Sequence, residues 1–188
     1  MKVTIYGSKR EWMPEDWKRQ IHHLIDHTCS GWLTDRRMSF LEVKVCLNKK
    51  HDLGGEVFPD WMARQYKPNH FKITINPDLC DNMKEFMIMI AHESIHITQY
   101  ATGKLAYRKT GTYWEGKKWD FPAPRHLGGS AYWETPWEVQ AYGLEKAMIW
   151  SFVNVQELAK QMEENGWLEA FKNADVDTSE IEIILEKS

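Results

Sequence analysis

The segment from Met83 to Thr102 limits the possible folds of this chain more than any other part of the sequence. Asp81 or Asn82 suits the N-cap of a helix, and Gly103 suits the left-handed residue that closes one. The stretch Phe86–Ala91 is entirely apolar, which is typical of a helix with buried surroundings. The sequence therefore predicts a buried helix over Met83–Thr102.

Alternating apolar residues before this helix predict a small sheet. Leu41–Leu47 and Phe71–Ile75 alternate with period two, and Val3–Tyr6 is a third short candidate strand. Pro14–Cys29 has apolar residues at helical spacing and a proline suited to a first helical turn. Asn48–Asn69 is interrupted by glycine and proline, and we expect it to be irregular.

The C-terminal half is predicted to be mostly helical after an irregular stretch. Leu105–Gly129 is aromatic, charged and rich in glycine and proline, which favours a hairpin or a long loop. A long helix should open after Thr135, break near Ser151 and end by Gly166, with a short helix from about Ser179.

These elements predict the α+β class, with a small mixed sheet packed on the central helix and further helices around it. A length of 188 residues fits a single domain over residues 1–188. Within that domain we expect residues from about 151 to 188 to form a helical extension.

Charge and hydropathy bear on partners and location. The net charge is −3 and no run of Lys or Arg is present, so nucleic acid is an improbable partner. Met1–Gly7 lacks the apolar core of a signal peptide, and no apolar run approaches the roughly 20 residues that span a bilayer. We expect a soluble, cytoplasmic protein that does not interact with membranes, whose oligomeric state the sequence does not indicate.

The central helix carries a motif with specific chemistry. His92-Glu93-Ser94-Ile95-His96 places two imidazoles one turn apart on the same helix face. Neutral imidazole is a preferred ligand of Zn²⁺, and a glutamate between the two histidines can take a proton from a metal-bound water. The motif predicts that His92 and His96 bind zinc and that Glu93 is the catalytic base. Cys29, Cys46 and Cys80 are too widely spaced to suggest a thiolate zinc site.

A catalytic zinc site needs a third protein ligand. Glu138 is the preferred candidate, because Ala141 one turn later would allow its helix to approach His92 closely. The alternative is that Thr135 and Glu138 form a capping box, with Glu138 satisfying only the first amides of its helix. His126 is the rival ligand, and Glu134 and Glu145 are more remote candidates.

The motif and Glu138-Val139-Gln140-Ala141 together resemble the gluzincin clan of zinc peptidases, in which a second helix supplies a ligand glutamate, often as Glu-x-x-Ala. The order of elements over about residues 1–165 is similar to a minimal zincin domain of the minigluzincin, ImmA/IrrE or SprT-like kind. SprT-like proteins usually use a third histidine, which this pairing lacks. The resemblance implies hydrolysis of peptide or protein substrates.

The resemblance also raises questions about substrate contacts. Phe71–Ile75 is either an edge strand that pairs with an extended peptide or a core strand. The oxyanion of the reaction needs a donor beside zinc, and four residues are candidates: Arg125, His126, Tyr132 and Tyr142. Several aromatic residues line a cleft or pack a hairpin onto the domain: Tyr107, Tyr113, Trp114, Trp119 and Phe121.

Other interpretations stay open at this stage. The chain is either an active peptidase or a binding or regulatory module that keeps the metal without general protease activity. A protease acting on DNA-bound proteins is a third hypothesis, which the acidic balance disfavours. His23 and His27 repeat the spacing of the motif, but no acid lies between them at the position of Glu93, so we interpret them as a polar face of the first helix.

Overall fold

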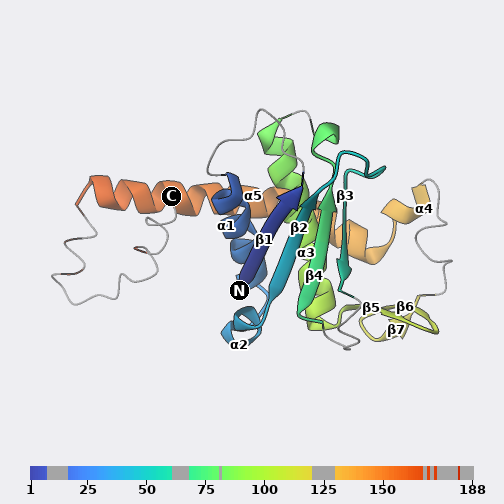
Figure 1. Ribbon diagram of the computed structural model, residues 1–188. Coiled ribbons are helices and arrows are strands. Elements are labelled where there is room, and N and C mark those ends of the chain that lie inside the picture. The colour runs from blue at the N-terminus through green and yellow to red at the C-terminus, as the bar shows by residue number, and fades with distance from the viewer. Residues whose placement is uncertain are drawn as a thin grey trace.

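The protein has the α+β architecture that the sequence predicts (Figure 1). The computed structural model describes residues 1–7, 17–60, 68–80, 82–119 and 130–166, together with residues 169, 172 and 182. A mixed sheet and a smaller antiparallel sheet are combined with helices, two of which are long.

The main sheet has four strands in the order β1 (Lys2–Gly7), β2 (Glu42–Leu47), β4 (His70–Ile75) and β3 (Gly55–Pro59). The first three are parallel, whereas β3 runs antiparallel to β4 at the edge of the sheet. The three strands predicted from alternating residues are confirmed to within one residue at either end.

The edge strand β3 departs from the prediction that Asn48–Asn69 is irregular. Gly55 and Pro59 bound this strand and hide its pattern, and a proline without an N–H is tolerated at a sheet edge. The idea that Phe71–Ile75 is an edge strand is wrong, because β4 pairs with β2 on one side and with β3 on the other. It is the core-strand alternative that the structure bears out.

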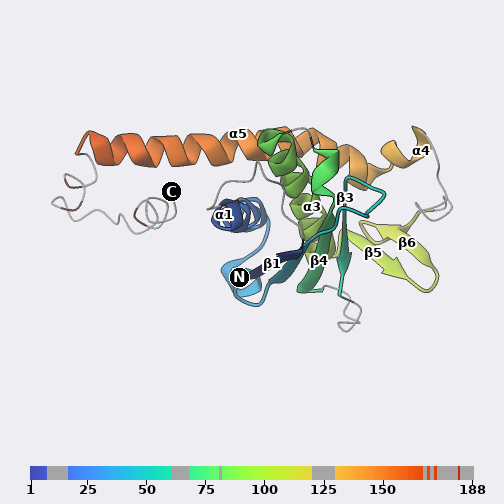
Figure 2. The same ribbon diagram turned by 45° about the horizontal axis from the view of Figure 1, so that its top comes forward.

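Two helices cover one face of the main sheet, as Figures 1 and 2 show: α1 (Trp17–Ser30) and α3 (Met83–Thr102). The inward side chains of β2 and β4 meet them in one core, which includes Val45, Ile73 and Ile90. Burial of this apolar surface is the main stabilisation of the fold. Two short elements lie in the connections: α2 (Asp35–Ser39) and the 3₁₀ turn η1 (Pro77–Leu79).

Helix α3 begins and ends where the sequence predicts. The Asn82 side chain accepts a hydrogen bond from the backbone N–H of Glu85 at 3.1 Å, and Gly103 closes the helix with a φ of 80°. Every residue from Ile90 to Ala101 is buried. Because this part of α3 is buried all round, its polar residues must find partners inside the protein.

The second long helix, α5 (Pro136–Glu164), crosses behind α1 and α3, and its C-terminal half extends past the sheet (Figure 2). It is continuous, so the predicted break near Ser151 is wrong. The Ser151 hydroxyl lies 3.1 Å from His27 Nε2, so this part of α5 contacts α1. The helix expected from about Ser179 lies outside the described residues.

A second sheet forms within the stretch predicted to be a hairpin or loop. Its strands are β5 (Leu105–Arg108), β6 (Gly111–Trp114) and β7 (Lys117–Lys118). The rings of Trp114 and Trp119 pack at 6.3 Å and 5.8 Å from the ring of Trp137 on α5. These two tryptophans therefore fasten the small sheet to α5, and the short helix α4 (Ser130–Trp133) precedes α5.

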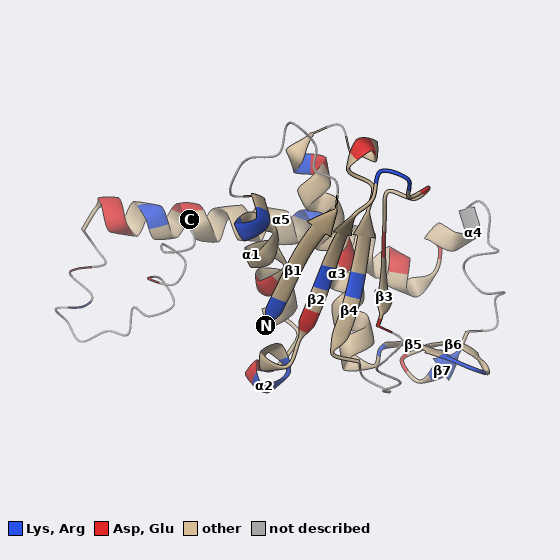
Figure 3. Cartoon of the chain, in the orientation of Figure 1, with Lys and Arg blue, Asp and Glu red and all other residues tan. Residues whose placement is uncertain are grey.

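Charged residues of both signs are interspersed over the molecule (Figure 3). Lys44 and Lys72 are neighbours in register on the outer face of the main sheet, and Lys44 pairs with Asp60 at 3.2 Å. Each helix in the described ranges is too short or too polar to cross a bilayer.

Candidate metal centre

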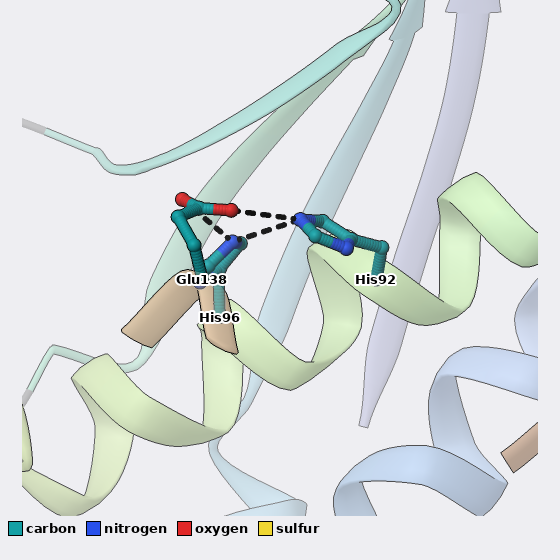
Figure 4. Close-up of side chains that lie close together, drawn as sticks. All are labelled: His92, His96 and Glu138. Carbon is teal, nitrogen blue, oxygen red and sulfur yellow. Dashed lines mark hydrogen bonds and ion pairs between the residues drawn. The ribbon is translucent and has the colours of Figure 1, made fainter. Parts of the chain in front are cut away.

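His92, His96 and Glu138 point toward one another in the interior of the protein (Figure 4). The two histidines come from successive turns of α3, and Glu138 comes from the first turn of α5. Nε2 of His92 lies 3.1 Å from Nε2 of His96. The Glu138 oxygens lie 3.3 Å from His92 Nε2 and 3.4 Å from His96 Nε2.

This arrangement fits a tetrahedral zinc ion. Ligands about 2.0 to 2.1 Å from zinc in tetrahedral geometry are separated from one another by roughly 3.3 Å. The three separations at the centre agree with that spacing, and the Oε2 atom of Glu138 is a buried acceptor that makes no hydrogen bond. Two imidazoles and one carboxylate are also a donor set that zinc uses in enzymes.

Glu138 does not cap its helix. Thr135 makes no side-chain cap, and its hydroxyl donates instead to the carbonyl oxygen of Tyr132 at 2.9 Å. The capping-box alternative is therefore wrong. The neighbouring Trp137 is 2% exposed, and its ring packs against Trp114 and Trp119. These contacts fix the backbone that carries Glu138.

The other nitrogen of each imidazole also has a partner. His92 Nδ1 donates to Oε2 of Glu145 at 2.8 Å, since a carboxylate can only accept. His96 Nδ1 lies 2.7 Å from Oε1 of Gln99. Gln99 Nε2 donates to the Trp137 carbonyl at 3.0 Å, which leaves Oε1 to accept from His96. Both Nδ1 atoms therefore carry hydrogen. Their hydrogen bonds fix the two rings so that both Nε2 atoms face the metal position.

Glu93 lies beside this centre and faces β3. It is 4% exposed, and a Cβ atom at Gly55 would lie only 2.8 Å from its Oε1 atom. Glycine at this position therefore allows the carboxylate to approach the strand closely. Burial raises the pKa of Glu93, and the imidazoles of His96 and His92 offset this only in part. A raised pKa suits a general base that works near neutral pH.

The charges at the centre support one another. Burial opposes the charged imidazole of His92, but Glu138 and Glu145 outweigh it and raise the pKa of His92 to about 10. Burial would likewise raise the pKa of Glu138, but His92, His96 and the Tyr132 hydroxyl lower it to about 2. Without a metal ion, a proton on His92 thus balances the buried carboxylates.

Two tyrosines adjoin the centre. The Tyr132 hydroxyl bonds the Glu138 carboxylate, and burial together with that carboxylate raises the pKa of Tyr132 well above its ordinary range. The ring of Tyr142 lies 4.6 Å from the ring of His92. Both of these candidate oxyanion donors are therefore close to the metal position, whereas Arg125 lies outside the described residues.

The remaining candidates are placed elsewhere. Glu134 is exposed and Glu145 is the Nδ1 partner of His92, so the structure brings neither into the three-residue cluster. His126 lies outside the described residues. The interpretation of His23 and His27 as a polar face is wrong, because His23 is 8% exposed and His27 packs against Phe152 of α5 at 5.7 Å.

Sequence reasoning missed the supporting contacts of Glu145, Gln99 and Gly55. Glu145 follows Glu138 by two helical turns and Gln99 follows His96 by three residues, so helical spacing contained a signal for both. Gly55 offered no signal, because its role depends on β3 lying against α3. Comparison of the chain with family models, curated proteins and solved structures finds no match.

Proposed function

We propose that this protein is a zinc-dependent metallopeptidase of the gluzincin type. The observation that carries the proposal is the meeting of His92, His96 and Glu138 around one buried point, with the carboxylate of Glu93 beside them. A purely structural metal site would have no use for an additional buried base of raised pKa. Glu145 and Gln99, which accept hydrogen bonds from the two Nδ1 atoms and orient both imidazoles, also support the proposal.

Each residue has a defined task in this proposal. His92, His96 and Glu138 hold zinc, which when bound activates a water molecule and polarises the scissile carbonyl. Glu93 accepts the proton of the attacking water and then delivers it to the leaving amine. Its burial keeps the proton affinity of the carboxylate high enough for both steps.

The edge of the main sheet supports an extended peptide as substrate. In the part of the chain that the structure describes, no strand pairs with the outer side of β3. This strand passes directly beside Glu93, as the contact at Gly55 requires. A peptide that adds to β3 by backbone hydrogen bonds would bring a peptide bond to the catalytic base.

The test is a Glu93→Gln variant, which removes the base but preserves the shape of the side chain. We expect it to keep zinc and to lose about 100- to 10,000-fold of the rate of peptide cleavage. Zinc is measured by elemental analysis, and cleavage by mass spectrometry of a mixed peptide library.

Glu85→Gln is the matched control, since Glu85 lies on the same helix but is exposed. Equal cleavage by the wild type and Glu93→Gln would contradict the proposal. Zinc binding without any cleavage by the wild type would favour the alternative, a binding or regulatory module that retains the metal.

A further inference from the structure

Three large apolar side chains lie exposed together next to the metal centre. Trp133, Val139 and Tyr142 line one open hollow, although they are 52%, 58% and 45% exposed. They come from α4 and the first two turns of α5. Exposed apolar side chains gathered at one place next to a candidate site are typical of a surface that binds a ligand.

The hollow adjoins the candidate site through Tyr142. The Tyr142 ring lies 4.6 Å from the His92 ring on one side and 5.3 Å from the Trp133 ring on the other. The residue before Trp133 is Tyr132, whose hydroxyl bonds Glu138. The Tyr142 ring is therefore in contact with both the wall of the hollow and an imidazole of the candidate site.

The backbone next to Trp133 is also held in place. The turn between α4 and α5 is closed by two hydrogen bonds from Thr135, at 3.2 Å from its N–H and 2.9 Å from its hydroxyl, both to the Tyr132 carbonyl. Thr135 itself is 2% exposed. Trp133 is thus attached to a fixed turn, and a fixed surface loses less entropy when it binds a ligand.

We propose that Trp133, Val139 and Tyr142 form the substrate subsite that selects a bulky apolar side chain, aromatic or branched aliphatic, adjacent to the bond that is cleaved. This inference rests on the proposed function. The two rings and the valine offer contact area and no charged group, so a charged side chain would lose water there without gaining a partner. A large apolar side chain would instead bury both its own surface and the exposed rings.

Two peptides test the subsite. They are fluorescence-quenched, contain only Ala, Ser and Gly around the centre, and differ in one central residue, Phe or Ala. We expect wild-type kcat/KM to favour the Phe peptide on the order of 10- to 100-fold, with cleavage next to Phe. In Trp133→Ala the preference should fall to within about threefold while zinc content is unchanged.

Trp150→Ala is the matched control. Trp150 is on the same helix as Tyr142 and is 72% exposed, and it does not line the hollow. This variant should keep the full preference for Phe. Equal cleavage of the two peptides by the wild type would overturn the inference, and so would an unchanged preference in Trp133→Ala.

Binding to the zinc-loaded Glu93→Gln variant separates this inference from the proposed function. If the wild type cleaves neither these two peptides nor any member of the mixed library, the proposed function fails. The subsite is then judged by affinity alone, measured by fluorescence anisotropy. Tighter binding of the Phe peptide that disappears on adding Trp133→Ala would still support the subsite. Equal binding of both peptides would refute it.

Discussion

Two pairs of histidines in this protein have the same spacing but different surroundings. His92 and His96 lie one turn apart on α3, and His23 and His27 lie one turn apart on α1. His92 and His23 are equally buried, each at 8% exposure. The same helix, α5, packs against both α1 and α3.

The pairs differ in what α5 places opposite them. It presents Glu138 and Glu145 to the pair on α3, whereas His27 meets the hydroxyl of Ser151 and the ring of Phe152. The pKa values follow this difference: burial lowers the pKa of His27, but the two carboxylates raise that of His92 to about 10. Histidine spacing is common to both pairs, so the carboxylates on the facing helix are what distinguish the candidate metal centre.

Removing the carboxylate that faces the α3 pair should have the largest effect. We expect Glu138→Ala to weaken zinc binding by more than about 100-fold, since it removes a direct ligand rather than an outer partner. Competition with a chromogenic chelator measures the affinity. Glu134→Ala, an exposed acid four residues earlier, should bind zinc like the wild type. Full affinity in Glu138→Ala would remove Glu138 from the ligand set.

The outer carboxylate should matter less. Glu145→Gln keeps the size of the side chain but loses the charge that accepts from His92 Nδ1, and we expect zinc affinity to fall about 10- to 100-fold. The same chelator assay applies, with the exposed Glu163→Gln on α5 as control. A loss as large as that in Glu138→Ala would mean that Glu145 is itself a ligand.

Protons should compete with zinc at the α3 pair. His92 is protonated below its pKa of about 10, and zinc must displace that proton. Affinity should therefore fall about tenfold per pH unit as the pH is lowered below 10, with about one proton released per zinc at pH 7. Calorimetry in buffers of different ionisation enthalpy counts the protons. Zinc uptake with no proton release would contradict the assigned charge of His92.

Crowding the catalytic base should lower turnover but not metal content. A Cβ at Gly55 would lie 2.8 Å from Glu93 Oε1 and 3.0 Å from Met89 Cγ, so the Glu93 side chain must shift to make room. A displacement of 1 Å in a catalytic group costs about 100-fold in rate. We expect Gly55→Ala to lower kcat about tenfold, measured on a cleaved peptide. Gly143→Ala is the control, because nothing lies within 4 Å of its added Cβ. Unaltered kcat in Gly55→Ala would show that Glu93 tolerates displacement.

The α1 pair should affect stability alone. His27→Ala removes the bond to Ser151 and the contact with Phe152, which together are worth about 1 to 2 kcal/mol of unfolding free energy. Urea denaturation of the zinc-free protein measures this change. Zinc affinity should stay at the wild-type level, and a loss of affinity in the folded variant would indicate a metal role for the α1 pair.

Local signals were enough to predict the elements that build the α3 side of the site. The Asn82 cap, the Gly103 terminus and the apolar run between them are encoded within the helix itself, so its bounds are predictable. Strand β3 was missed because its conformation depends on pairing with β4 rather than on its own alternation. The break expected at Ser151 is absent, and that serine instead contacts His27, more than a hundred residues away in sequence.

The candidate site was predictable in part for the same reason. Two of its residues share one helix, and Glu138 could be chosen by the spacing of a known clan. The supporting roles of Glu145 and Gly55 could not, because they depend on how α5 and β3 align with α3. The part of the site that could not be predicted depends on contacts between elements that are remote in sequence.

Zinc content of the purified protein tests the central claim most directly. Elemental analysis after exposure to zinc and removal of the excess should find about one ion per chain in the wild type and in His23→Ala, and almost none in His92→Ala. A wild-type protein that takes up no zinc, or a folded His92→Ala variant that retains it, would contradict a metal centre on α3.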